Sequence, residues 1–395
     1  MIEAASSATG VRTGLDVLLG DPGPLAGRRV GLLTNHTGLT ASFERNIDVL
    51  RAAGVELVAV FGPEHGLTGT AQAGGAEPSG HDPATGLPVV DAYGAGPVMD
   101  EVLAGRGLAA LVLDLQDVGV RYWTYTWSMY DAMAACARLG IEVVVLDRPN
   151  PLGGVRVEGP ELDRRFASFV GRTAVRQRHG LTSGELARLF DLETPGRLTV
   201  VPMAGWDRSR PWEWTGRPWV MPSPNLPTPD SVWAFAATGL LEGTNASEGR
   251  GTTRPFEIFG APYVDDRLVP ALRALELPGV AFREIHVRPT FHKHAGSVVH
   301  GAHLHLTDRD AYRPVRTGVA ILETLARLYP GEFAVLPPGT EVDHVGHALD
   351  RLWGSDRLRL ALAEQRQGLW EGVEDATTAE TYPDHLLLYR ARRDT

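Results

Sequence analysis

The sequence lacks the features that tie a chain to disulfide chemistry, membranes or nucleic acid. It has one cysteine, Cys136, among 395 residues, so no intrachain disulfide or cysteine-rich zinc motif exists. Cys136 lies in an alanine-rich, helix-like stretch, where we expect it to fill packing space. No stretch approaches the ~20 apolar residues of a membrane span. The formal net charge of −10 disfavours nonspecific binding to nucleic acid or to an anionic membrane.

The first residues, Met1-Ile2-Glu3-Ala4-Ala5, lack the basic region and the long apolar stretch of a secretory signal. The sequence as given therefore predicts a cytoplasmic protein. No pattern in it fixes an oligomeric state.

Apolar strand-like runs alternate with helix-like segments through most of the chain. Each of the strand-like runs in the N-terminal half ends in a polar loop; they span residues 29–34, 55–61, 108–115, 141–146 and 198–203. Helical patterns cover residues 43–53, 129–139 and 183–190. This alternation predicts an α/β fold, a parallel sheet with helices on both faces. A chain of this length favours two domains, which we place at residues 1–222 and, as a smaller α/β domain, 223–395.

The most informative loop is Phe61-Gly62-Pro63-Glu64-His65-Gly66, which follows a run of β-branched and other apolar residues. Such a run, stopped by Gly-Pro, is typical of a buried parallel strand that ends in a tight loop. Ligands in open α/β folds sit beyond the carboxyl ends of such strands. Glu64 is therefore a candidate general acid or base, although a helix-capping or salt-bridged glutamate is the alternative.

Two further loops follow strand-like runs and gather polar side chains. Asp114 interrupts an apolar run, which costs free energy unless the carboxylate is paired. The aromatic residues from Tyr122 to Trp127 suit sugar rings, or else a helical core. The candidate ligand contacts in these loops are Asp114, Gln116, Asp117, Arg121, Arg148 and Asn150, and Glu158 is either a second catalytic carboxylate or part of a structural ion pair.

The segment 242–257 is dense in glycine, hydroxyl groups and charges of both signs, and its backbone amides could bind an anion. Its candidate ligand contacts are Asn245, Glu248, Arg250 and Thr252. Histidines crowd residues 292–305, but no cysteine or closely spaced carboxylate completes a ligand set, so we expect no metal. Lys293 and His294 are better candidates for anion contacts.

Seven motifs, in this order, resemble the NamZ-type exo-β-N-acetylmuramidases of bacteria. They are Gly31-Leu32-Leu33-Thr34-Asn35, Phe61-Gly62-Pro63-Glu64-His65-Gly66, Asp114-Leu115-Gln116-Asp117-Val118-Gly119, Leu146-Asp147-Arg148-Pro149-Asn150-Pro151, Val157-Glu158-Gly159-Pro160, Pro222-Ser223-Pro224-Asn225 and the stretch from Glu242 to Pro255. The resemblance implies a Rossmann-like N-terminal domain, a smaller C-terminal domain and a cleft between them. It also implies a glycosidase that releases N-acetylmuramic acid from the non-reducing end of peptidoglycan fragments, without a cofactor.

The same resemblance makes Glu64 the leading catalytic residue, with Glu158 or Glu248 as the second carboxylate. The acetamido group of the substrate could replace that second carboxylate, as in substrate-assisted families. Muramic acid carries a lactyl carboxylate, for which Arg148, Arg250 and Arg121 are candidate partners. The other expected substrate contacts are His65, Asp114, Gln116, Asp117, Asn150, Asn225, Asn245, Thr252, Lys293 and His294.

The chain departs from many of these relatives in two places. It has Met133-Ala134-Ala135 where they carry a helical glutamate, and Val298-Val299-His300 where they carry a cysteine. If the helical glutamate is catalytic, the chain has lost it. The competing hypothesis is therefore a muropeptide-binding or sensing protein without turnover. A dinucleotide enzyme is not expected, because the string Gly105 to Ala110 precedes a strand instead of following one.

Overall fold

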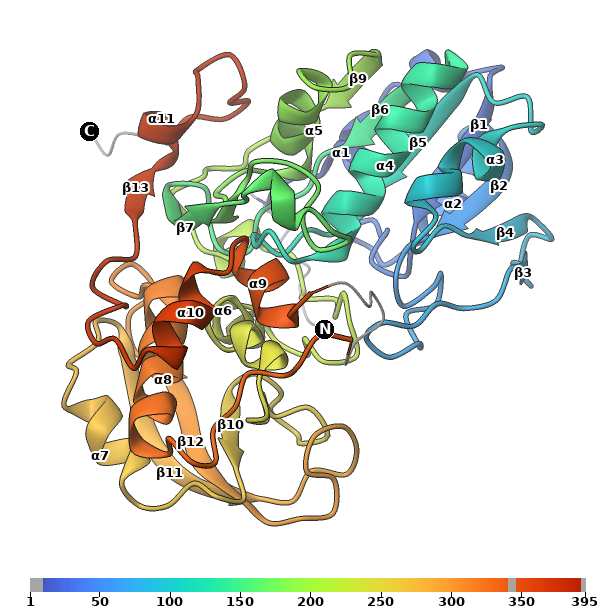
Figure 1. Cartoon of the computed structure of the whole chain (residues 1–395). Coiled ribbons are helices and arrows are strands. Elements are labelled where there is room, and N and C mark those ends of the chain that lie inside the picture. Colours follow the sequence, from blue (N-terminus) through green and yellow to red (C-terminus); the bar gives the residue numbers. More distant parts are fainter. Residues whose placement is uncertain (1–9, 340–345, 392–395) are drawn as a thin grey trace, which may run out of the picture.

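A seven-stranded sheet dominates the N-terminal half of the computed structural model, which describes residues 10–339 and 346–391 (Figure 1). Its strands are β1 (Arg29–Thr34), β2 (Glu56–Gly62), β3 (Gly80–His81), β4 (Pro88–Asp91), β5 (Ala110–Asp114), β6 (Glu142–Leu146) and β9 (Arg197–Val201). They lie in the order β3-β4-β2-β1-β5-β6-β9, and all neighbours are parallel except β3 and β4. The sheet extends from β1 first to one side and then to the other, as in a Rossmann-like fold.

Helices cover both faces of this sheet, which confirms the predicted architecture. One face packs against α1 (Gly14–Leu18) and α2 (Asn46–Ala52), and the other packs against α3 (Met99–Leu103), α4 (Thr124–Leu139) and α5 (Ser183–Asp191). Leu32 belongs to the first core and Leu33 to the second. Successive residues thus face opposite cores, because side chains alternate across a strand.

The helix boundaries show where local signals succeed and where they fail. The start predicted at Ser183 is confirmed for α5, whose N-cap is Thr182 in a capping box with Glu185. By contrast, α4 begins at Thr124, five residues before the predicted Met129. The aromatic residues at its start conceal the helix, because they lack a clear polar face. Short 3-10 turns are η1 (Gly23–Leu25), η2 (Gly96–Val98), η3 (Arg164–Phe166) and η4 (Trp212–Thr215).

The C-terminal part is built on a smaller antiparallel sheet of β10 (Ile258–Ala261), β11 (Val280–Val287) and β12 (Val299–Leu306), with β12 in the centre. Its helices are α6 (Pro229–Thr238), η5 (Gly239–Gly243), α7 (Leu268–Arg273), α8 (Pro314–Leu328), α9 (Ala348–Trp353) and α10 (Arg357–Ala363). Phe282 and Leu304 of the sheet share a core with Ile321 of α8. In the described ranges, no helix combines the length and the apolar character of a membrane span.

A third sheet, absent from the sequence prediction, joins the last segment of the chain to strands of the N-terminal half. It contains β7 (Arg156–Glu161) between β8 (Arg176–Arg178) and β13 (Asp375–Thr377), and α11 (Thr378–Thr381) follows β13. The last segment thus returns to the N-terminal part, beside β7 in Figure 1. The boundary at residue 222 stays a prediction, and any such division leaves β13 paired across it.

Close packing between α6 and α8 depends on Gly318. A Cβ atom at this position would lie 2.3 Å from the Ala237 carbonyl oxygen, whereas a Cβ at Gly331 would meet nothing within 4 Å. We expect Gly318→Ala to lower the free energy of unfolding by about 2 kcal/mol through overpacking, and Gly331→Ala to change it by less than about 0.5 kcal/mol. Denaturant midpoints would measure both; equal effects would contradict this account of the α6–α8 contact.

Candidate functional site

A cavity of about 270 Å³ lies beyond the carboxyl end of β2, and residues from both parts of the chain form its wall. Residues 1–222 contribute Glu64, His65, Ala73, Gly74, Tyr122, Trp123, Thr124, Phe169 and Val170. Residues 223–395 contribute Ser223, Leu226, Phe235, Glu242, Arg250, Phe256, His292, Ala348, Arg351 and Leu352. Among the described residues of this wall, the carboxylates are those of Glu64 and Glu242.

Glu64 is held in a fixed orientation at the cavity wall. Its side chain is 7% exposed. One carboxylate oxygen accepts a hydrogen bond from the Gly74 amide at 2.6 Å, and the other accepts one from the Thr124 hydroxyl at 2.5 Å. Because a hydroxyl can donate or accept, Thr124 can stay bonded to Glu64 whether the carboxyl group is ionised or protonated. This arrangement suits a residue that gives up and regains a proton.

His65 fixes the loop that follows Glu64. Its backbone amide donates to the Gly75 carbonyl at 3.0 Å, and its Nδ1 lies 2.8 Å from the Ala71 carbonyl oxygen. A carbonyl only accepts, so Nδ1 carries a proton. His65 has a positive φ of 69°, a conformation that few non-glycine residues adopt. The strained turn brings Gly74 back to Glu64.

The C-terminal part of the chain supplies a network of polar and charged side chains around Glu248. Its carboxylate is fully buried; one oxygen lies 2.9 Å from Arg250 Nη1 and 3.1 Å from His292 Nδ1, and the other lies 3.0 Å from Lys293 Nζ. Burial opposes ionisation, but Lys293, His292 and Arg250 lower the pKa of Glu248 well below its usual range. The three partners thus favour the ionised form of Glu248, which in turn holds their side chains in place.

Arg250 connects this network to the cavity. Its Nη2 lies 2.7 Å from a Glu242 oxygen, and its guanidinium stacks 4.9 Å from the centre of the Phe256 ring. Burial disfavours the charge on Arg250, yet Glu242 and Glu248 together raise its pKa above the usual value. Unlike Glu248, Glu242 and Arg250 both reach the cavity wall.

Lys293 and His294 serve the loops rather than the cavity. The Lys293 ammonium donates to three backbone carbonyls, those of Leu241, Glu242 and Ala246, besides Glu248. His294 Nε2 lies 2.7 Å from the Asn245 carbonyl oxygen. The expected anion contacts thus hold the segment 242–257 in place.

Aromatic rings form much of the apolar wall. Tyr122 and Trp123 line the cavity with Phe235, and the Tyr122 hydroxyl donates to the Phe235 carbonyl at 2.8 Å. Tyr125 and Trp127 instead pack in the core, where their polar atoms donate to backbone carbonyls. The helical-core interpretation is thus confirmed for Tyr125 and Trp127, whereas contact of Tyr122 and Trp123 with a sugar ring stays a prediction.

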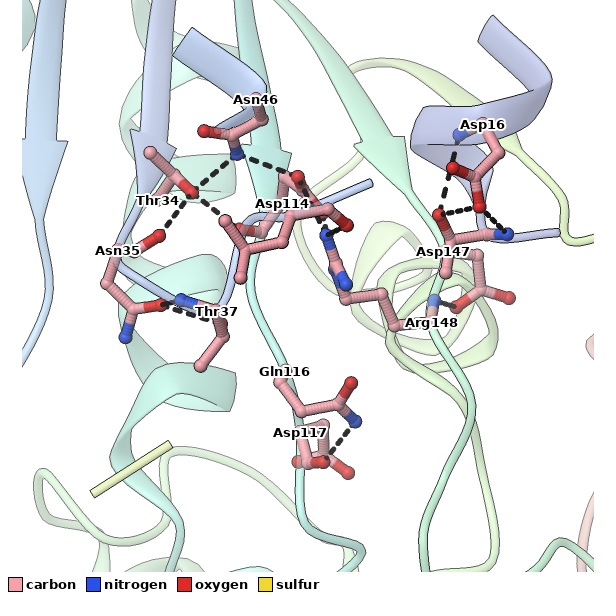
Figure 2. Close-up of polar contacts among 12 residues, drawn as sticks. Asp16, Thr34, Asn35, Thr37, Asn46, Asp114, Gln116, Asp117, Asp147 and Arg148 are labelled. Atoms are coloured by element: carbon pink, nitrogen blue, oxygen red, sulfur yellow. Dashed lines mark hydrogen bonds and ion pairs between the residues drawn. The ribbon is translucent and has the colours of Figure 1, made fainter. Parts of the chain in front are cut away.

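Asp114 and Arg148 form a buried ion pair where the strand order reverses, between β1 and β5 (Figure 2). Arg148 donates to both Asp114 oxygens, at 2.6 and 3.1 Å, and Asn46 donates to one of them at 2.7 Å. The space left beside Arg148 and Gln116 has a volume of about 20 Å³, little more than one water needs. This ion pair therefore fills the crevice in which Rossmann-like folds usually hold a ligand.

Gln116, Asp117 and Asn150 shape the loops around this ion pair without lining the cavity. Gln116 donates to the Pro149 carbonyl at 2.8 Å, and Asp117 accepts from the Gly119 amide at 2.7 Å. Asn150 donates to the Leu181 carbonyl at 2.9 Å. Their hydrogen-bonding groups thus fix backbone.

Glu158 and Arg121 also lie away from the cavity wall. Glu158 pairs with Arg178 at 2.6 Å, and burial raises the pKa of its carboxyl despite that cation. Arg121 donates to the carbonyls of Pro160, Val175 and Leu352, and burial lowers its pKa to about 10. Both residues connect β7 to its neighbours.

Three more predicted contacts act through the backbone or through a neighbouring loop. Asn225 donates to the Gln72 side chain at 3.1 Å and so ties its loop to the loop after Glu64. Asn245 donates to the Glu332 carbonyl at 2.7 Å, and Thr252 to the Gly249 carbonyl at 2.6 Å. Of the predicted residues, the structure therefore brings Glu64, His65 and Arg250 together at the wall, with Glu248 directly behind Arg250.

Sequence reasoning missed Glu242, Thr124 and Arg351 as wall residues. Glu242 is the first residue of the segment 242–257, in which the sequence indicated other ligand contacts. The 3-10 turn η5 places Glu242 at the cavity wall, whereas Glu248 lies behind it. Thr124 stood among aromatics, with no sign that it would meet Glu64. No motif marked Arg351.

Another cavity, of about 390 Å³, borders the ends of β1, β2 and β4. Its acids are already engaged. Hydrogen bonds from Thr68 and Thr70 lower the pKa of Glu77 although burial opposes this, and Arg45 and Thr85 lower that of Asp82. The cavity at Glu64 is the better candidate for proton transfer.

The departure at Met133-Ala134-Ala135 falls within α4, away from the wall residues at its start. Met133 and Ala135 are buried in the core beside α5 and the sheet. The described wall already holds two carboxylates without a contribution from this turn of the helix.

Comparisons with known proteins identify the family of the chain. The N-terminal domain family of the exo-β-N-acetylmuramidase NamZ matches residues 30–230, and the corresponding C-terminal domain family matches residues 233–381. The chain is 46% identical over 355 residues to the peptidoglycan β-N-acetylmuramidase NamZ of Bacillus subtilis (strain 168). The aligned region covers 88% of this chain and 83% of that protein.

Two solved structures have a similar fold. A DUF1343 family protein from Bacteroides fragilis NCTC 9343 superposes with a TM-score of 0.81 at 34% identity, over 92% of this chain and 94% of that one. A second DUF1343 family protein from the same strain gives a TM-score of 0.74 at 26% identity, over 97% and 99%. The chain therefore belongs to the NamZ family of exo-β-N-acetylmuramidases, which are glycoside hydrolases.

Proposed function

We propose that this glycoside hydrolase releases N-acetylmuramic acid from the non-reducing end of peptidoglycan fragments, with Glu64 as general acid. The observation that carries the proposal is the meeting of Glu64 and Glu242 at one partly apolar wall. Glycoside cleavage uses two carboxyl groups beside the scissile bond. A cavity of about 270 Å³, just below the ~300–1,000 Å³ range of small-molecule sites, suits one terminal sugar better than a chain.

In this proposal Glu64 protonates the leaving oxygen, and Thr124 keeps it aimed in both protonation states. Glu242 takes the second role and stabilises the positive charge that develops on the sugar. Glu248 is a poor choice for that role, because Arg250, His292 and Lys293 already occupy both of its oxygens. Glu158 pairs with Arg178 away from the wall.

Arg250 is proposed to bind the lactyl carboxylate. Of the three arginines suggested by the sequence, it is the one that lines the cavity. Arg148 pairs with Asp114 and Arg121 with backbone carbonyls, and neither of them lines the cavity. Since Glu242 and Glu248 fix Arg250 beforehand, little side-chain entropy is lost when an anion binds.

Replacing the acid should abolish turnover without disturbing the fold. We expect Glu64→Gln to lower kcat on a chromogenic β-N-acetylmuramide by about 10²–10⁴-fold, the usual contribution of a positioned acid. Glu257→Gln is a matched control, because Glu257 is similarly buried, at 6% exposure, but lies outside the wall. It should retain activity within about twofold.

Full turnover by Glu64→Gln would rule out the acid role. Tight binding of the muramide by the unmodified chain, with no release over hours, would instead favour the muropeptide-binding alternative.

Thr124 tests the positioning of Glu64. Thr124→Val keeps the shape but removes the hydroxyl, and we expect kcat to fall about tenfold at similar KM, roughly the worth of one hydrogen bond to a charged group. Thr124→Ser should restore most of kcat. Equal loss in Val and Ser variants would indicate a packing role only.

Substrate discrimination tests Arg250. We expect Arg250→Ala to lower kcat/KM for a β-N-acetylmuramide about 10–100-fold more than for the matching N-acetylglucosaminide, which lacks the lactyl carboxylate. Steady-state kinetics on both substrates would measure the ratio. Equal losses on the two substrates would contradict a lactyl contact and leave Arg250 as a partner of Glu242 and Glu248.

A further inference from the structure

We propose that Glu284, His286 and His300 form a zinc site at the stem of the β11–β12 hairpin. His286 and His300 lie directly opposite each other on the two antiparallel strands. Glu284 precedes His286 by two positions and therefore shares its face. One ligand atom from each of the three side chains lies within 4.8 Å of the other two.

The contacts already present bring these groups together. His300 Nε2 lies 2.9 Å from a Glu284 oxygen, and the His286 and His300 rings stack with their centres 4.1 Å apart. In a tetrahedral zinc site, with bonds of about 2.1 Å, ligand atoms are about 3.4 Å apart. Side-chain rotations that move the ligand atoms by about 1 Å would bring them to this spacing. There is room for such rotations because Glu284 and His286 are exposed.

The donor set favours zinc over the harder cations. Two imidazoles and one carboxylate are ligands that zinc binds tetrahedrally, with water as the fourth ligand. Calcium and magnesium prefer oxygen ligands throughout. Sequence analysis expected no metal because no carboxylate stood close to the histidines along the chain, but the neighbouring strand supplies Glu284.

The opposite face of the same hairpin provides an internal comparison. His303 and His305 also approach each other, with ring centres 3.9 Å apart. Here Arg283 donates to His305 Nε2 at 3.1 Å and lies 2.9 Å from His303 Nδ1. A guanidinium occupies the nitrogen lone pairs and repels a second cation. Burial, His305 and Arg283 lower the pKa of His303 to about 4. One face thus offers a carboxylate to a cation, and the other a positive charge.

The position of the site suggests what the metal does. Val287 and Val299 form the last pair of the hairpin, immediately beyond His286 and His300. The loop of residues 288–298 then reaches the cavity, where His292 lines the wall and Lys293 binds Glu248. A metal bridging both strands would hold the stem and so restrict the loop. Any effect on turnover rests on the proposed function, whereas metal binding itself does not.

Direct binding tests the site without an activity assay. The full-length, untagged, metal-stripped chain should bind Zn²⁺ at a 1:1 ratio in calorimetry, and Co²⁺ should give the visible absorption of a tetrahedral site. We expect His286→Ala and His300→Ala each to weaken Zn²⁺ binding by at least the 10–100-fold that changes next to a metal site cost. His303→Ala and His305→Ala, on the opposite face, should leave the affinity unchanged.

Hydrogen exchange tests the consequence for the loop. Zinc should slow exchange of the amides in residues 288–298 of the unmodified chain and have no effect in His300→Ala, while melting temperature rises with zinc concentration only in the former. Absence of 1:1 binding, or binding that survives both His286→Ala and His300→Ala, would overturn the site. Binding without slower exchange in residues 288–298 would show that the metal does not restrict the loop, and would overturn that part of the proposal.

Discussion

The buried carboxylate of Glu248 is the constraint on which the cavity wall depends. An isolated charge in a protein interior is too costly to persist, so Glu248 must have positive charge and hydrogen-bonding groups around it. Arg250 comes from its own segment, and His292 and Lys293 come from the loop between β11 and β12. Two segments far apart in the sequence are thereby fixed against each other. Gly249 makes the turn possible, since a Cβ there would lie 2.3 Å from the Ile258 carbonyl oxygen.

The carboxylates of this chain divide according to their partners. Asp114, Glu158 and Glu248 each meet a buried arginine at 2.6–2.9 Å, so their charge serves the fold. Glu64 has only neutral donors, a hydroxyl and an amide, and is the one whose partners tolerate a change of protonation. Glu242 shares Arg250 but keeps a place at the wall. Motif matching alone could not make this division, because all five stand in the motifs that carry the family resemblance.

Much of the fold was predictable because its signals are local. Apolar runs that end in Gly, Pro or polar residues located five strands of the main sheet, and Glu64 followed from its place after β2. The third sheet was not predictable, since β7 and β13 pair over more than two hundred residues and both partners of β7 are only three residues long. Glu242 was missed for a related reason. A sequence shows that Glu242 and Glu248 share a segment, but only the packing of η5 and Lys293 decides which of them faces solvent-accessible space.

The β11–β12 hairpin shows how far charge context, rather than residue type, decides a site. Both faces carry a pair of histidines in ring contact. Register alone puts Glu284 beside one pair and Arg283 beside the other, because adjacent residues of a strand point to opposite faces. A shift of one residue in pairing would exchange the two environments. In the cavity, too, local geometry decides, because the turn at His65 and the turn at η5 determine which acids reach the wall.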